Sequence, residues 1–137
     1  MVAASPNQLA VRNLLRGSRV GLPGAQDVAD MIKVEPLTPG QITSGSDGPV
    51  LKAAGFDEKT PLWYYVLKEA EIMGQGKHLG PVGSRIVAEV FYGLMLGDPN
   101  SFKRQRPDWK PTLPAAQPGT FTMADLLRFV NDIDPIG

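Results

Sequence analysis

The chain has 137 residues, with 14 basic and 14 acidic side chains and a formal net charge of zero. This length suits one domain of ordinary size, and the neutral balance removes the broad basic surface expected of a protein that binds nucleic acid or an anionic membrane. The sequence contains no cysteine, which excludes disulfides, thiolate catalysis, zinc–thiolate sites and iron–sulfur clusters.

No apolar run approaches the roughly 20 residues of a membrane-spanning helix, and the first residues lack the charged and apolar regions of a signal peptide. The sequence therefore predicts no membrane and no nucleic-acid partner, and it leaves the compartment unknown. Glycine (15) and proline (13) are frequent, and several prolines follow a capping-type residue just before an apolar-periodic stretch. Because this arrangement begins helices, we expect an all-α chain of about five to seven short helices in a single unit over residues 1–137.

Apolar residues at helical spacing, bounded by proline and glycine, predict the helices of the first half of the chain. Gly17 is a plausible stop for the first of them. A polar, glycine-bearing loop over 43–48 is the best candidate for disorder. In chain order, the expected helices cover residues 6–16, 25–33, 39–42 (a single turn capped at Thr38), 49–54 and 61–73.

The most apolar segment follows Gly80-Pro81, where apolar residues repeat every fourth position in two adjacent rows. Such a wide stripe is typical of a helix buried on most sides, so residues 81–96 are expected to form the central helix of the fold. Arg85 and Glu89 interrupt the stripe at i, i+4 spacing. We interpret them as a structural ion pair rather than as catalytic residues.

The C-terminal part begins with a proline-rich segment over 106–120, which cannot form a long helix and is expected to run as extended chain. Thr122 and Asp125 then have the spacing of a capping box and predict a last helix with an apolar face. Basic residues around Phe102 and Trp109 suggest nucleic acid with aromatic stacking. In a neutral chain, we prefer a solvated basic loop in which Trp109 packs inward.

His78 is the only histidine, and it lies in a glycine-bearing loop. It could be a haem or metal ligand, but no second histidine exists to complete a metal triad, so a solvated loop side chain is the preferred interpretation. The acidic residues show no pairing on a recognisable cleft, and no serine has a base arranged near it in the sequence. The sequence therefore predicts no catalytic residue and no metal site.

One stretch, RNLLRGSRVGLPG (Arg12–Gly24), resembles a segment of the animal-type, myeloperoxidase-like haem peroxidase superfamily that is usually written LN-x-x-R-x-R-D-H-G-L-P. Further along, Leu79–Phe102 is similar to the family's Gly-Pro, long apolar helix, Gly-Asp and aromatic pattern. Three stretches look most like bacterial members of the superfamily: TPLWYYVLKEAE, GPVGSRIVAEV and FTMADLLRF. The first stretch aligns without a gap at Asn13, Arg16, Gly21, Leu22 and Pro23.

The resemblance implies that the chain corresponds to the C-terminal portion of a hydrogen-peroxide-dependent oxidoreductase with a histidine-ligated haem. By the family pattern, Asn13 would accept the hydrogen bond of the proximal imidazole, and Arg16 would lie near the haem propionates. The family's haem-site histidines lie upstream of the matched segment, so this chain alone is expected to bind no haem and to be inactive. Residues 17–20 depart from the family's Arg-Asp-His, which leaves the details of that turn open.

Two functions from different classes follow. The first is a proximal-side scaffold of a haem peroxidase-like protein, of which this chain would be a fragment or a truncated relative. The alternative is a small helical protein-interaction module without catalysis. Because the missing upstream part of a peroxidase would normally cover apolar surface, the expected partner is that upstream segment or further copies of the chain in a homo-oligomer.

Overall fold

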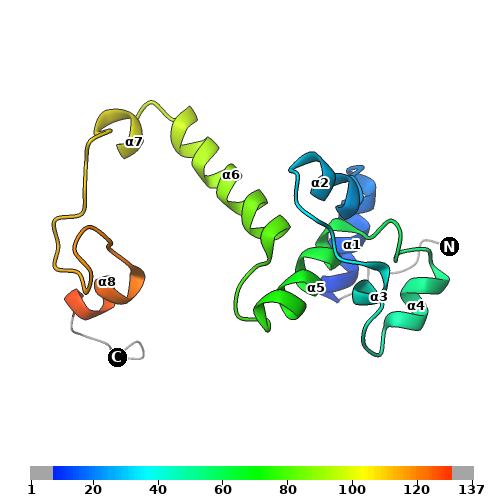
Figure 1. Cartoon of the computed structure of the whole chain (residues 1–137). Coiled ribbons are helices and arrows are strands. Elements are labelled where there is room, and N and C mark those ends of the chain that lie inside the picture. Colours follow the sequence, from blue (N-terminus) through cyan, green and yellow to red (C-terminus); the bar gives the residue numbers. More distant parts are fainter. Residues whose placement is uncertain (1–7, 131–137) are drawn as a thin grey trace. The chain divides into compact units, whose positions relative to one another are not determined.

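The computed structural model describes residues 8–130, which contain helices and no strand. This confirms the all-α prediction. The described residues contain eight helices, and the one added to those expected is α7, a single turn of 4 residues like the expected α3. The helices are α1 (Leu9–Arg19), α2 (Ala25–Met31), α3 (Pro39–Ile42), α4 (Gly48–Ala53), α5 (Leu62–Gly74), α6 (Pro81–Gly97), α7 (Phe102–Gln105) and α8 (Met123–Val130) (Figure 1).

The chain divides into two compact units, one ending at Val90 and the other beginning at Phe91. Each is described by itself below. That residues 1–137 form a single helical unit stays a prediction.

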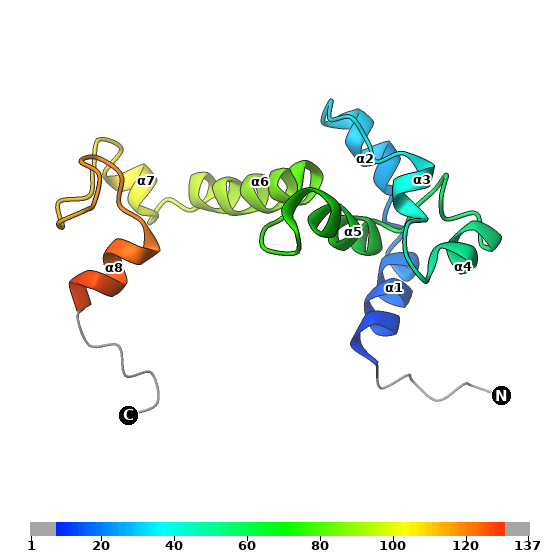
Figure 2. The ribbon, with the colours of Figure 1, turned by 60° about the horizontal axis from the view of Figure 1, so that its bottom comes forward.

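In the first unit, α5 contacts α1, α2 and α3, which gather around it (Figure 2). Tyr65 on α5 is fully buried in a cluster of apolar side chains that includes residues of α2 and α3. A buried phenol needs a hydrogen-bond partner, and the Tyr65 hydroxyl accepts one from the backbone N–H of Leu37 at 2.8 Å. The buried apolar core consists of Ala25, Ala29, Leu37, Ile42, Tyr65 and Val82.

The ends of the helices are set by residues that are close to them in the sequence. At α3, Thr38 Oγ1 accepts from the N–H of Gln41 at 3.3 Å, and Gln41 Oε1 accepts from the N–H of Thr38 at 2.8 Å, a complete capping box. The first helix does not stop at Gly17 as expected but continues to Arg19. It is Gly21, at φ +66°, that reverses the chain after α1, because glycine adopts this left-handed conformation without steric cost.

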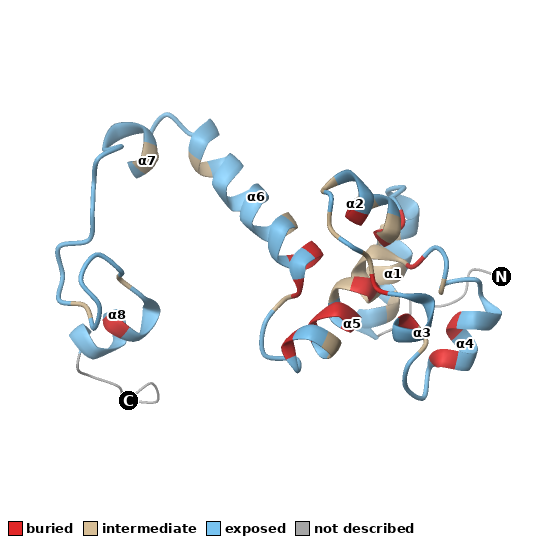
Figure 3. Ribbon diagram, viewed as in Figure 1, coloured by how far each residue is buried: buried red, intermediate tan, exposed pale blue. Residues whose placement is uncertain are grey.

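The second half of α6 is largely exposed, which contradicts its expected place as a helix buried on most sides. Only Val82 and Gly83, in its first turn, are buried (Figure 3). The apolar pattern was identified correctly, but a pattern shows only that a face needs cover, not that the described residues supply it. The exposed apolar residues of this helix are Val87, Val90, Phe91, Tyr92, Leu94 and Leu96. Arg85 and Glu89 form the predicted ion pair on its surface.

In the second unit, no helix lies between Gln105 and Met123, as the prolines predict. The predicted capping box is present: the N–H of Asp125 donates to Thr122 Oγ1 at 3.3 Å, and the N–H of Thr122 donates to Asp125 Oδ2 at 2.9 Å. The expected inward packing of Trp109 is wrong, since its side chain is 54% exposed. The loop that carries it is too short of apolar neighbours to bury an indole, and only Phe102 stacks on it.

Candidate functional site

Asn13 and Arg16, the two residues that the family resemblance assigns to a haem, lie one turn apart on α1 and so share one face. The helix has no buried residue. Asn13 is half-buried and Arg16 is exposed. No hydrogen bond or ion pair within residues 8–130 occupies either side chain, and neither contributes a buried polar atom without a partner. The pair is therefore available to a group outside this part of the chain.

The availability of this pair fits the two haem-related roles, because an amide oxygen can accept from an imidazole and a guanidinium suits a propionate. Among the described residues, no group of three or more metal-ligating side chains occurs. His78 is exposed in the loop after α5, with Nδ1 3.0 Å from the carbonyl oxygen of Leu79. It is the loop side chain that the sequence predicts.

We expect Asn13→Ala to change the free energy of unfolding of this chain by well under about 1 kcal/mol, because no partner within the described residues loses a hydrogen bond. Urea unfolding followed by far-UV circular dichroism measures the change. A loss comparable to that of a buried hydrogen-bonding residue would show that Asn13 is structural here and would remove it from the candidate site.

A buried carboxylate that the sequence did not single out joins α5 to α6. Glu69 is fully buried, and its carboxylate accepts from the N–H of Val82 at 3.0 and 3.2 Å and from the N–H of Gly83 at 3.2 Å. These N–H groups belong to the first turn of α6, where a helix has no partners of its own and favours negative charge. With both oxygens engaged, Glu69 stabilises the α5–α6 corner and is not free to move a proton.

A polar face of α5 holds the loop that was the candidate for disorder. Lys68 is only 5% exposed, and its ammonium donates to the carbonyl oxygen of Ser44 and to Glu71 Oε2, the latter at 3.1 Å. A buried ammonium needs such partners, since burial without them disfavours its charge. The lysine therefore fixes the loop to α5 and is not a free nucleophile.

The same loop is fixed a second time by Tyr64, whose hydroxyl donates to Asp47 Oδ2 at 2.6 Å. Burial and this bond to a carboxylate raise the pKa of Tyr64, and the bond lowers the pKa of Asp47. The hydroxyl of Tyr64 is thus engaged as a hydrogen-bond donor. Like Lys68 and Glu69, it has a structural role and no unused reactive group.

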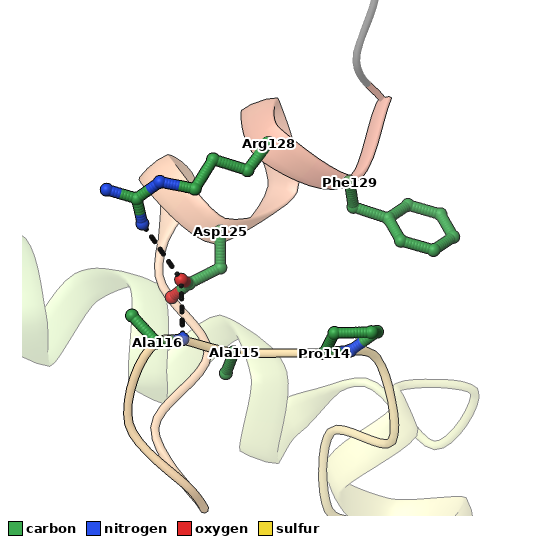
Figure 4. Close-up of a pocket in the computed structure, with 6 residues that line it drawn as sticks. All are labelled: Pro114, Ala115, Ala116, Asp125, Arg128 and Phe129. Carbon is green, nitrogen blue, oxygen red and sulfur yellow. Dashed lines mark hydrogen bonds and ion pairs between the residues drawn. The ribbon is translucent and has the colours of Figure 1, made fainter.

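The second unit has a shallow pocket of about 450 Å³ beside α8, lined by Pro114, Ala115, Ala116, Asp125, Arg128 and Phe129 (Figure 4). Asp125 is 3% exposed, and its carboxylate is the centre of the hydrogen bonds beside this pocket. Its carboxylate accepts from the N–H of Ala116 at 3.0 Å, from both polar groups of Thr122, and from Arg128 Nη1 at 3.2 Å. These bonds, first those from Thr122, lower the pKa of Asp125 to about 2. It is therefore a fixed anion that ties the proline-rich segment to α8.

The low pKa predicts acid sensitivity in this part of the molecule. Because the folded pKa lies below the unfolded value of 3.8, the stabilisation by Asp125 is present above about pH 4 and is lost as the pH falls towards 2. In a nuclear magnetic resonance titration, the amide signal of Ala116 should shift with a midpoint near pH 2, and Asp125→Asn should abolish that shift. Asp108→Asn, at an exposed position, is the matched control and should leave it unchanged. A midpoint near 3.8 would contradict the bonding described.

Comparison with known proteins identifies no similar protein. No protein-family model matches the chain, and no curated protein or solved structure is found to be similar to it. The link to haem peroxidases therefore rests on the sequence motifs alone. Among residues 8–130, no helix has the length and apolar character needed to cross a bilayer.

Proposed function

We propose that this chain is the proximal-side scaffold of a haem peroxidase-like oxidoreductase, inactive by itself and completed by a further polypeptide segment. The observation that carries the proposal is the pair on α1. Asn13 and Arg16 match the family motif, share one face, and are unused by other described residues. Because no described residue bonds to these two side chains, both are available to bind groups of another polypeptide segment.

Uncovered apolar surface supports the same proposal. The helix α1 is strongly amphipathic, but none of its residues is buried. Leu9 is 69% exposed and Leu15 is 42% exposed. An amphipathic helix is normally stabilised by burying its apolar face. Leu9 lies four residues before Asn13, on the side of α1 that carries Asn13 and Arg16, so a further segment that covers Leu9 would bring its own groups next to this pair.

In the completed protein, a haem held by an imidazole of that segment would supply the activation of hydrogen peroxide. Asn13 would accept the second N–H of the imidazole, which would fix the orientation of the ring and increase its basicity. Arg16 would pair with a haem propionate. The buried Glu69 and the core around Tyr65 keep α5 in place, and α1 packs on α5.

The test begins with the gene. The region upstream of the Met1 codon is sequenced, and the product of the whole reading frame is expressed beside the present chain. We expect the longer product to show a Soret band and peroxide-dependent oxidation of a phenolic donor, and the present chain to show neither. Turnover by the present chain that disappears in His78→Ala would overturn the proposal, as would a longer product without haem.

In the longer product, Asn13→Ala should raise the reduction potential of the iron, because the imidazole loses the acceptor that increases its basicity. Asn13→Asp keeps an acceptor oxygen at the same position and should leave the potential close to that of the unchanged protein or lower it. A potential that is the same in both variants would remove Asn13 from the proposed role even if the protein binds haem.

The alternative is a small helical interaction module, and the exposed apolar residues of α6 favour it. Their number exceeds what a solvent-facing helix usually carries, and such a surface marks an interface. In this case the cover is another protein or a second copy of the chain. The absence of a Soret band from the longer product, together with self-association of the present chain in sedimentation, would favour this alternative.

A further inference from the structure

Two aromatic side chains of the second unit stand out from the surface. Phe102 on α7 and Trp109 in the following loop are 53% and 54% exposed. Their rings pack edge to face, with centroids 5.7 Å apart and planes at 71°. The pair forms one apolar projection, and aromatic residues in such exposed positions are typical of binding surfaces.

Cationic side chains lie close to this aromatic pair in the sequence. Between Phe102 and Lys110 the sequence has four cations against one acid, Asp108. None of the four makes an ion pair in the part of the chain that the structure describes, where the four ion pairs involve other residues. The local excess of positive charge is thus uncompensated, although the chain as a whole is neutral. The four cations are Lys103, Arg104, Arg106 and Lys110.

A shallow pocket of about 360 Å³ lies within the same loop and is lined by Gln105, Arg106, Pro107, Asp108 and Trp109. The pocket joins a guanidinium and an indole. A partner that inserts an apolar side chain beside Trp109 would therefore place neighbouring acidic groups close to cations.

These features favour a short acidic peptide over an extended polyanion. The two rings contact each other edge to face, with planes at 71°, so they do not form parallel platforms on which successive bases of a strand could stack. The positive charge is local, and the rest of a neutral chain carries the compensating negative charge. An extended anionic surface would meet both signs, whereas a short segment meets only the local excess within a screening length of about 8–10 Å.

We propose that the loop Phe102–Lys110 is a docking site for an acidic peptide segment of another protein, with an apolar side chain seated beside Trp109. This site uses none of the residues assigned to the haem, and so it stands or falls independently of the peroxidase proposal. The acidic groups pair with the cations of the loop, and the aromatic pair supplies the apolar contact.

The test uses a fluorescent decapeptide of alternating Glu and Leu, with a decapeptide of alternating Gln and Leu as its matched control. Binding to the full chain is followed by fluorescence anisotropy of the peptide at low salt. We expect the Glu–Leu peptide to bind at least about tenfold more tightly. The double variant Lys103→Gln/Arg106→Gln and the single variant Trp109→Ala should each weaken binding by about tenfold.

Lys52→Gln, an exposed charge removal on α4, should change the affinity by less than about twofold. Far-UV circular dichroism checks that each variant keeps its helix content. Equal affinity for the two peptides, equal loss in Lys52→Gln, or no binding at millimolar peptide would overturn the proposal. Tighter binding to a thymidine decamer or to phosphatidylserine vesicles than to the acidic peptide would also overturn it, in favour of those partners.

Discussion

Glu69→Gln is expected to lower the free energy of unfolding of the first unit by about 1.5–3 kcal/mol, the range for a hydrogen bond to a charged group. The variant keeps the size of the side chain but replaces one carboxylate oxygen with an NH₂ group. With the amide oxygen at the position of Oε2, which now accepts from the N–H groups of both Val82 and Gly83, the NH₂ group would take the position of Oε1, which faces the N–H of Val82. Two donors facing each other in a buried site leave at least one unsatisfied.

Urea unfolding followed by far-UV circular dichroism measures this loss, and amide hydrogen exchange at Val82 and Gly83 locates it. Glu89→Gln is the matched control, because Glu89 lies on the exposed surface of α6 and pairs only with Arg85. An exposed i, i+4 pair contributes about 0.3–0.5 kcal/mol. If both variants lose stability equally, the carboxylate of Glu69 does not hold the start of α6.

Gly48→Ala is expected to cost about 1–3 kcal/mol through overpacking. Gly48 begins α4 and is buried, and an added Cβ would lie 1.9 Å from the carbonyl oxygen of Thr43. The obstacle is backbone, so relief requires the loop over 43–48 to move. Such movement would disturb the bonds from Lys68 to Ser44 and from Tyr64 to Asp47.

The loss is again measured by urea unfolding. The ring resonances of Tyr64 in nuclear magnetic resonance spectra report locally on its contact with Asp47. Gly40→Ala is the control, since an added Cβ there meets nothing within 4 Å. Within α3 this change should be neutral or stabilising by up to about 1 kcal/mol. A Gly48→Ala variant as stable as Gly40→Ala would show that the close approach at Thr43 is not a constraint.

Features that depend on neighbours in sequence were predictable. Thr38 and Gln41 form a capping box, as do Thr122 and Asp125, because each box needs only residues three positions apart. The prolines of 106–120 kept that segment free of helix for an equally local reason. The Arg85–Glu89 pair followed from helical spacing alone.

The roles of buried polar residues were not predictable. Glu69 finds its partners 13 and 14 positions further on, and Lys68 finds the carbonyl of Ser44 24 positions back. A signal existed for Glu69, an acid within an apolar stretch upstream of Gly80-Pro81, but it does not name a partner. The candidate pair Asn13 and Arg16 came from the family motif, and the structure adds that both are accessible on one face.

By itself, the sequence determined the all-α class, the order of the helices and the caps at Thr38 and Thr122, because these depend on backbone conformations and contacts within a few residues. Only the tertiary structure decided which apolar faces are covered. The stripe of α6 was expected in a core and has no buried residue beyond Gly83, and Trp109 was expected inward and lies outside. The physical reason is that apolar periodicity shows only which face of a helix is apolar. Burial of that face requires a second surface, and its position cannot be predicted from a local sequence pattern.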